Sequence, residues 1–238
     1  MPDPSPEIVL EVAGLRSGYG SVPVLHGISF DVGREIFAIL GANGAGKTTL
    51  LATLAGLISV MDGGITLHGT DITRTPSYES ARLGVGYVPQ ESAIFPDLTI
   101  MENLLIGGMI GKRPHDQRLE EVFETFPDLR KKTALRAGNL SGGESRIVAC
   151  GRALMQDPDV LLLDEPTAGL SPLYVEQFFE KILEIHETRG VSVVLSEQNA
   201  TKALSIADRV MVLSLGEGSD VLDAHEVTTE RLKEAYKL

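Results

Sequence analysis

Apolar positions repeat along the chain with two different periods, and the alternation of these periods predicts a protein of mixed strands and helices. Short apolar runs indicate strands, and the continuous ones indicate strands buried on both faces. We expect strands at 8–12, 24–32, 36–40, 63–67, 84–88, 160–163, 191–195 and 209–215. Apolar residues at helical spacing follow residue 46 and recur over 171–189, which predicts a helix in each place. A turn is expected at 18–20. Strands that alternate with helices favour an α/β fold with a mainly parallel core sheet flanked by helices.

The middle of the chain, 91–156, carries helical signals almost throughout. Thr99 and Glu102 have the spacing of a capping box, which opens a helix. Pro127 is expected to end the next helix, because proline cannot continue one. A further apolar stripe with helical spacing begins after 142–143.

These patterns predict one domain over 8–238. We expect 8–90 and 157–238 to form its core, and 91–156 to form an inserted helical subdomain. The proline-rich start, 1–7, is expected to be a disordered leader.

The composition restricts the classes of function that this chain can have. Its net charge of −12 argues against a nucleic-acid-binding face, because such a face needs clustered basic residues. No apolar run approaches the roughly 20 residues that a membrane-spanning helix needs. The first residues lack the basic and apolar regions of a signal peptide, so we expect a cytosolic location. The single cysteine, Cys150, excludes a disulfide within the chain and is expected to be a buried helical residue.

The strongest chemical signal is the segment 41–49, which matches the phosphate-loop pattern G-x-x-x-x-G-K-[ST] in full. Its glycines let backbone N–H groups converge on phosphate oxygens, and the following helix adds its positive end. Lys47 is expected to reach the β- and γ-phosphates of ATP, and the Thr48 hydroxyl to bind Mg²⁺. A plain strand–helix turn is disfavoured, because a buried strand precedes the segment and an amphipathic helix follows it. The candidate ATP-binding residues are Gly41, Asn43, Gly44, Ala45, Gly46, Lys47, Thr48 and Thr49.

Two acidic residues follow the apolar run 160–163, at the end of a strand where α/β sheets place ligands. Asp164 is a candidate ligand for the Mg²⁺ that bridges the phosphates. Glu165, one residue later, is a candidate for polarising the water that attacks the γ-phosphate. Taken alone, the pair fits an ordinary acidic strand end, but the phosphate loop favours the catalytic interpretation.

A second candidate anion site opens the helix after residue 140. Ser141, Gly142 and Gly143 place a hydroxyl and free backbone N–H groups at a helix start. Without the other motifs, an ordinary capped helix start after a loop would be the favoured interpretation of this segment.

Together these segments resemble the nucleotide-binding subunit of an ATP-binding-cassette (ABC) transporter, over roughly residues 8–215. The Walker A segment 41–49, the signature 140–144 and the Walker B segment 160–165 occur in the order and spacing of that family. The resemblance implies a P-loop NTPase fold of ABC type with an N-terminal antiparallel β region. It also implies that two subunits pair head to tail, so that the signature of one subunit completes the ATP site of the other.

Other positions acquire roles only through this resemblance. Tyr19 resembles the aromatic residue that stacks on adenine. Gln90 resembles the Q-loop glutamine, which contacts Mg²⁺ or the attacking water and connects the two subdomains. The segment 168–172 resembles the D-loop, which crosses the dimer interface.

The chain is also similar to the branch of this family that energises branched-chain amino acid uptake, the LivF type. The segments that carry this similarity are 41–44, 95–99, 126–129, 151–155, 169–172 and 197–200. The branch implies a second ABC ATPase (another copy or a LivG-like subunit), two membrane permeases, a separate solute-binding protein and no nucleic acid. It places the chain peripherally at the cytoplasmic face of the membrane. Related urea and amide importers, and soluble ABC ATPases, remain alternatives.

The sequence departs from the family pattern at two places. Gln198 stands where most members have a histidine; a glutamine can hydrogen-bond a γ-phosphate or orient water, but it does not titrate near neutrality. The segment 216–220 is acidic and glycine-rich, where the family has a hairpin with a basic residue. We expect either a shorter or looser hairpin or a changed partner surface, followed by a short closing helix at 231–238.

Overall fold

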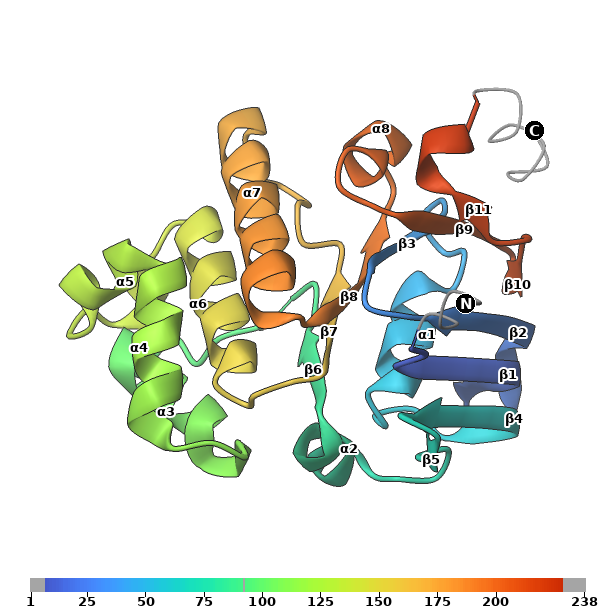
Figure 1. The fold of residues 1–238 in the computed structure, drawn as a ribbon, viewed down its shortest axis with the longest axis horizontal. Coiled ribbons are helices and arrows are strands. Elements are labelled where there is room, and N and C mark those ends of the chain that lie inside the picture. Colours follow the sequence, from blue (N-terminus) through green and yellow to red (C-terminus); the bar gives the residue numbers. More distant parts are fainter. Residues whose placement is uncertain (1–6, 92, 229–238) are drawn as a thin grey trace, which may run out of the picture.

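The computed structural model describes residues 7–91 and 93–228. Two β-sheets lie at one end of this part of the molecule, and a group of helices lies at the other (Figure 1). The mainly parallel α/β fold expected from the sequence is therefore confirmed, including the antiparallel region near the N-terminus. The expected leader, apart from Glu7, and the expected closing helix fall outside the described residues.

The core sheet has five parallel strands in the order β9-β3-β8-β7-β6. These strands are β3 (Ile36–Leu40), β6 (Val85–Val88), β7 (Val160–Asp164), β8 (Ser192–Glu197) and β9 (Arg209–Ser214). Two short strands, β10 (Glu217–Gly218) and β11 (Leu222–Asp223), pair antiparallel with β9. Side chains alternate across β3, so that Ile36 and Ala38 face one core cluster while Phe37 and Ile39 face another. This two-sided burial explains the continuous apolar runs in the sequence.

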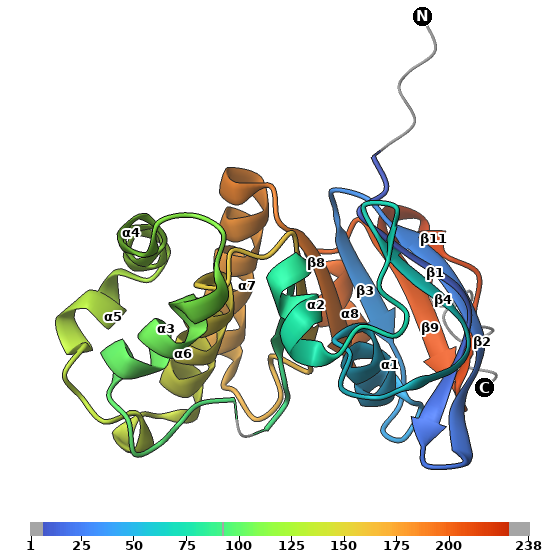
Figure 2. The same cartoon turned by 90° about the horizontal axis from the view of Figure 1, so that it is seen from below.

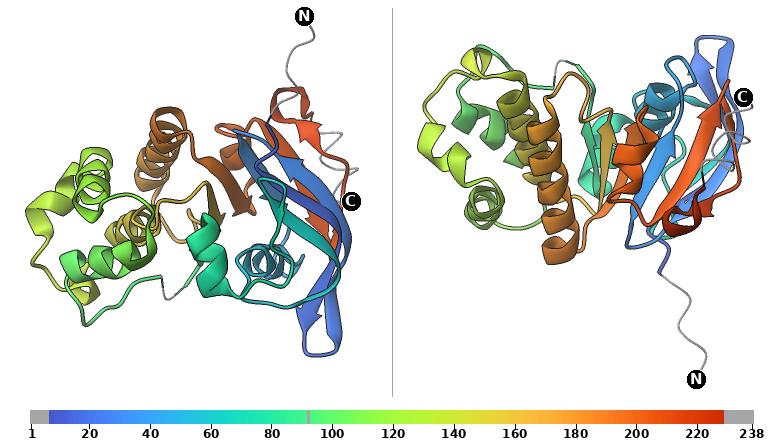
Figure 3. Two further views of the ribbon diagram at one scale, coloured as in Figure 1. Left: turned by 60° about the horizontal axis from the view of Figure 1, so that its bottom comes forward. Right: turned by 90° about the horizontal axis from the view of Figure 1, so that it is seen from above.

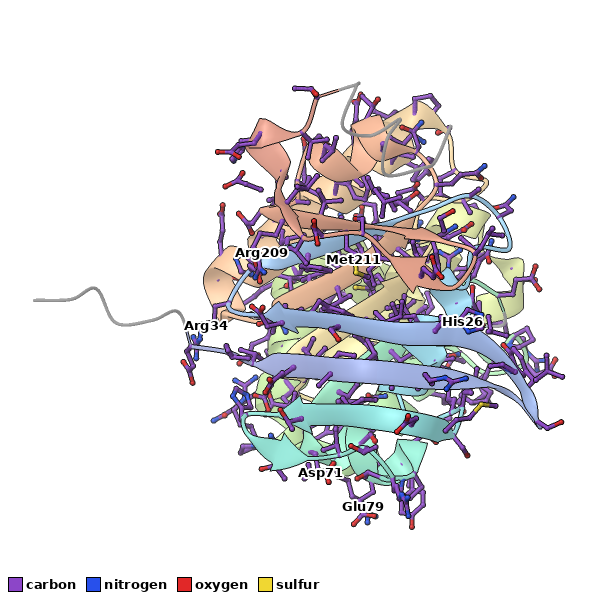
Figure 4. The ribbon with its side chains drawn as sticks, turned by 90° about the vertical axis from the view of Figure 1, so that its right-hand side faces the viewer. His26, Arg34, Asp71, Glu79, Arg209 and Met211 are labelled. Carbon is purple, nitrogen blue, oxygen red and sulfur yellow. The ribbon has the colours of Figure 1, made fainter. Side chains whose placement is uncertain are left out.

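The second sheet is antiparallel and has the order β2-β1-β4-β5. Its strands are β1 (Leu10–Tyr19), β2 (Val22–Val32), β4 (Val60–Leu67) and β5 (Thr70–Asp71). The turn expected at 18–20 begins two residues later, because β1 continues to Tyr19 through register irregularities. Arg209 and Met211 of β9 lie beside this sheet (Figure 4), and the Arg209 guanidinium bonds Asp31 of β2 at 3.1 Å.

Helix α1 (Lys47–Leu54) lies between the two sheets (Figure 2). Seven of its eight residues are buried, and Thr48 is the exposed one. The sequence predicts that only one apolar stripe of this helix is buried. The structure buries almost the whole helix, because both sheets cover it. The helix also ends before Ile58, because Gly56 adopts a left-handed φ of 73° in the turn that follows.

The remaining helices are α2 (Ser77–Leu83), α3 (Ile100–Gly107), α4 (His115–Thr125), α5 (Pro127–Lys132), α6 (Gly142–Leu154), α7 (Pro172–Arg189) and α8 (Ala200–Leu204). Single 3₁₀ turns occupy Gly108–Ile110, Ala137–Asn139 and Ala224–Glu226. Helices α3 to α6 gather on the side of α7 that faces away from the sheets (Figure 3). No helix in the described ranges combines the length and apolarity needed to cross a membrane.

Local sequence signals in the helical part have clear structural outcomes. The capping box of Thr99 and Glu102 is present at the start of α3. Pro127 ends α4, as expected, but it also opens α5 as its first residue, where its missing N–H costs nothing. Cys150 is buried on α6, as expected, and burial raises the pKa of its thiol to about 12.

The C-terminal hairpin is short, in agreement with one of the two expectations, but it is well ordered by contacts with the rest of the fold. Leu215 and Gly216 form its two-residue turn with φ values of 49° and 78°, and Glu217 pairs with Ser214. The Gly216 N–H donates to the Ala45 carbonyl of the phosphate loop at 2.9 Å. A Cβ atom on Gly216 would lie 1.9 Å from the Val24 carbonyl oxygen, so the turn accepts only glycine without a shift.

Candidate nucleotide-binding site

The phosphate loop connects the buried strand β3 to helix α1. Gly44 and Gly46 adopt left-handed φ values of 79° and 108°, which side chains rarely tolerate. At Gly41 the reason for glycine is space, because a Cβ atom would lie 2.5 Å from the Leu213 carbonyl oxygen. The conformation of the loop thus depends on glycines at three of its positions.

Lys47 is a buried cation at the base of this loop. Its Nζ donates to the carbonyl oxygens of Gly41 and Ala42 at 2.8 and 3.1 Å. It also forms an ion pair with Glu165 Oε1 at 3.0 Å. Because charges interact strongly where water is excluded, this ammonium makes the loop a favourable place for an anion.

Asp164 ends β7 as a buried carboxylate. Its Oδ1 accepts a hydrogen bond from the Ser196 hydroxyl at 2.8 Å, and its Oδ2 has no hydrogen-bond partner among the described residues. Burial raises the pKa of Asp164, against the lowering effects of Ser196 and Thr48. An unsatisfied buried carboxylate oxygen beside a hydroxyl is the kind of donor set that Mg²⁺ takes, so these residues fit the cation implied by the sequence.

Glu165 is held in a strained backbone conformation next to this aspartate. Its φ of 43° lies in the left-handed region, and its N–H donates to the Ser196 hydroxyl at 3.0 Å. Its side chain lies between Lys47 and Gln90, whose Nε2 donates to Glu165 Oε2 at 3.1 Å. The structure thus brings together three residues that lie far apart in the sequence.

Ser196 contacts both acidic residues, and sequence reasoning did not identify it. It lies directly opposite Asp164 in the pairing of β7 with β8. A polar residue near the end of a buried strand was the available signal, but the pairing of the two strands is not visible in the sequence.

A cavity of about 380 Å³ lies over the phosphate loop. This volume is in the usual range for small-molecule sites. Tyr19 is 58% exposed at its rim. The residues that line the cavity are Tyr19, Val24, Asn43, Gly44, Gly46, Lys47, Thr48, Thr49, Gln90 and Glu165.

Gln198 is not among these lining residues. It is exposed and borders a separate hollow of about 400 Å³, together with 42–45 and 213–215. It therefore lies beside the phosphate loop but outside the cluster of Lys47, Gln90 and Glu165.

The signature residues occupy the start of α6, and none of them lines the cavity over the phosphate loop. Ser141 and Glu144 form a reciprocal cap: the Glu144 N–H donates to the Ser141 hydroxyl, which in turn donates to Glu144 Oε2 at 2.7 Å. Lys132 and the Ser141 donors lower the pKa of Glu144 to about 2. The first N–H groups of α6, from Gly142 and Gly143, have no acceptor within the helix and are available to an anion.

Comparisons with known proteins agree with these observations. A family model described as ABC transporter matches residues 25–168. The high-affinity branched-chain amino acid transport ATP-binding protein BraG of Pseudomonas aeruginosa is 44% identical over 200 residues, which cover 83% of this chain and 85% of BraG. A probable branched-chain amino acid transport ATP-binding protein, LivF of Archaeoglobus fulgidus, is 37% identical over 210 residues, covering 87% of this chain and 89% of LivF.

Solved structures with the same fold include ATP-binding cassettes. The ADP conformation of MJ1267, described as an ATP-binding cassette of an ABC transporter, has a TM-score of 0.83 and is 26% identical. That match covers 97% of this chain and 95% of the MJ1267 chain. A nucleotide-free ATP-binding cassette from an ABC transporter matches with the same TM-score at 25% identity, covering 97% of this chain and 96% of the other.

Proposed function

Because this chain belongs to the ABC transporter family, we propose that it is the ATP-hydrolysing subunit of an importer for branched-chain amino acids. The observation that carries the proposal is the convergence of Lys47, Gln90 and Glu165 at one cavity over the phosphate loop. The substrate class is supported by BraG and LivF, which are both named for branched-chain amino acid transport.

In this proposal, ATP binds with its phosphates on the loop of residues 41–49 and its adenine on Tyr19. Lys47 would exchange its contact with Glu165 for one with the β- and γ-phosphates. Thr48, Asp164 and Gln90 would hold Mg²⁺, which offsets charge on the phosphates when it is bound. The unpartnered Oδ2 of Asp164 and the exposed Thr48 side chain support this assignment.

Glu165 is the proposed general base. Its two carboxylate oxygens bind Lys47 and Gln90. When phosphate oxygens neutralise Lys47, Glu165 becomes free to accept a proton from water, and Gln90 to orient that water. Gln198 would assist from the other side of the loop by hydrogen bonding. Because phosphoryl transfer depends mainly on positioning and charge stabilisation, these side chains suffice.

A second subunit completes the site in this proposal. Ser141, Gly142 and Gly143 would contact the γ-phosphate held by the Walker A segment of a partner, which is another copy or a LivG-like ATPase. Two membrane permeases would bind the pair at the cytoplasmic face of the membrane, and a separate solute-binding protein would deliver the amino acid. The absence of the signature from the cavity over the phosphate loop supports this arrangement.

Glu165→Gln tests the assignment of the base. We expect the ATPase rate to fall by about 10²–10⁴-fold, because the amide cannot accept the proton, while ATP binding and ATP-induced pairing remain. Steady-state phosphate release measures the rate, nucleotide titration measures ATP binding, and light scattering with ATP measures the pairing. Glu184→Gln is a matched control, because it breaks a lysine–glutamate pair of 2.7 Å on α7, away from the cavity. Hydrolysis at the wild-type rate in Glu165→Gln would show that another group acts as the base.

The transport function needs its own experiment. The tagged chain, purified from detergent-solubilised membranes, is expected to bring down two permeases, and vesicles carrying the complex should take up leucine only with ATP. Uptake of urea or an amide in place of leucine would favour the related importers. Recovery of the chain with soluble partners alone would favour a soluble ABC ATPase.

A further inference from the structure

One side chain of helix α6 is hydrogen-bonded to the segment after β6 that contains Gln90. Arg146, in the second turn of α6, donates from its two terminal nitrogens to the carbonyl oxygens of Pro89 and Gln90 at 2.9 and 3.0 Å. No other α6 side chain within 142–154 hydrogen-bonds these two residues. Guanidinium geometry suits this contact, because its fork of N–H groups can serve two neighbouring acceptors at once.

The contact with Gln90 extends a continuous series of polar interactions. From the phosphate loop, Lys47 Nζ contacts Glu165 Oε1 at 3.0 Å, and Glu165 Oε2 accepts from Gln90 Nε2 at 3.1 Å. The Gln90 carbonyl then accepts from Arg146 at 3.0 Å. The series therefore begins at the base of the phosphate loop and ends on the helix whose first residues are the signature.

The surroundings keep this guanidinium in place. Arg146 is partly buried, and burial lowers its pKa, while the carboxylates of Asp164 and Glu197 act in the opposite direction. Hydrogen bonds from a charged donor are strong in such surroundings, since little water competes for the carbonyl oxygens.

We propose that Arg146 is a positioning residue that couples the two nucleotide-contacting ends of this chain. One end is the cluster of Lys47, Gln90 and Glu165, which binds the chain's own ATP; the other is the signature, which contacts the partner's ATP. Phosphate binding at Lys47 releases Glu165 and Gln90, the Gln90 backbone shifts, and Arg146 transmits that shift to α6. The inference rests on the proposed function.

Hydrogen–deuterium exchange on the full chain tests this coupling, with and without AMP-PNP and Mg²⁺, at a concentration where light scattering reports a monomer. In the wild type, the analogue should slow exchange in 41–49. It should also change exchange in 140–147 by at least about fivefold, the lower end of ordinary allosteric couplings. Arg146→Lys should keep the slowing in 41–49 and lose most of the change in 140–147, because an ammonium lacks the fork.

Arg189→Lys is the matched control. Arg189 is also a partly buried guanidinium, and it joins α7 to α4 by donating to the Glu121 carbonyl and to the Thr125 hydroxyl. Its replacement should lower the thermal midpoint but leave the response of 140–147 intact. Arg146→Gln supplies a second variant if Arg146→Lys fails to fold, because the amide can donate to one carbonyl at a time.

A kinetic readout separates positioning from simple loss of structure. In the paired enzyme, Arg146→Lys should lower kcat at least about tenfold while the Kd for ATP stays within about twofold. The inference would be overturned if both Arg146 variants changed exchange in 140–147 as much as the wild type does. It would also be overturned if the analogue slowed exchange at 41–49 in the wild type without changing exchange at 140–147. No slowing at 41–49 in the wild type would overturn the proposed function, and the inference with it.

Discussion

Lys47, Asp164 and Glu165 each carry a local cost that the rest of the fold has to offset. Lys47 and Asp164 are buried charged groups, and Glu165 has a left-handed backbone conformation. A strained non-glycine residue costs on the order of 1–3 kcal/mol. Costs of this kind concentrate at functional sites, where the local rules of stability conflict with the chemistry. Their coincidence around one cavity is the physical reason for assigning the chemistry there.

Gln198 leads to a prediction about pH. The wild-type ATPase profile should show no acid limb from this position, because an amide does not titrate near neutrality. Gln198→His should add an acid limb with an apparent pKa of about 6.5, since protonation then changes the charge beside the phosphate loop. Steady-state rates from pH 5.5 to pH 8.5 measure this limb, with Glu187→His on the exposed face of α7 as the control.

An unchanged acid limb in Gln198→His would mean that this position does not act on the bound phosphates. Gln198 borders a hollow separate from the main cavity. A histidine at this position can therefore act on the bound phosphates only if its side chain reaches across the phosphate loop.

Motif residues could be predicted from the sequence, but the residues that hold them in place could not. Lys47 and Thr48 are specified by one continuous segment, and Asp164 and Glu165 by another. Ser196 reaches Glu165 across 31 positions, and Arg146 reaches Gln90 across 56. Such contacts depend on strand pairing and helix packing, which a single sequence does not display.

Among the elements, the core strands buried on both faces were the most predictable, whereas β1 runs to Tyr19, well beyond the expected 8–12. Strand β3 has the bounds that its apolar run predicts, because a strand buried on both faces has a continuous signal. The apolar stripe of α1 predicted too little burial, since the polar residues Thr49 and Thr53 are buried as well. Thr53 avoids an unsatisfied hydroxyl by donating to the Thr49 carbonyl at 2.7 Å. The sequence does not reveal this bond.

The C-terminal hairpin leads to a prediction about stability. Gly216→Ala should lower the free energy of unfolding by about 2–4 kcal/mol, because the new methyl meets the Val24 carbonyl at a left-handed φ. The affinity for ATP should fall as well, since Gly216 donates to Ala45 in the phosphate loop. Urea unfolding and nucleotide titration measure the two effects.

Gly14→Ala is the control for this clash. Gly14 has a similar left-handed φ of 59°, but a Cβ atom there would meet nothing within 4 Å. Its replacement should cost about 1 kcal/mol, the strain of the backbone conformation alone. Equal losses in the two variants would mean that the tight contact between the hairpin and β2 contributes nothing to stability.

At the level of the whole molecule, the two segments that are proposed to bind anions do not meet within one chain. The signature opens α6, while the cavity over the phosphate loop is lined from β1, β2, the loop after β3, α1 and the segments after β6 and β7. In the proposed head-to-tail pair, the signature of each chain would lie at the other chain's loop, which is a closed symmetric arrangement when both chains are copies. The central claim is therefore that each hydrolytic site contains residues of two subunits.

A mixing experiment tests that claim most directly. Lys47→Ala removes the phosphate-binding cation, and Gly142→Asp adds a negative charge to the signature at a position with open space around it. Each variant alone should be inactive, whereas an equal mixture should recover about a quarter of the wild-type ATPase rate, because half of the pairs are mixed and each holds one complete site. A mixture that pairs with ATP but is no more active than either folded variant alone would contradict the two-subunit site.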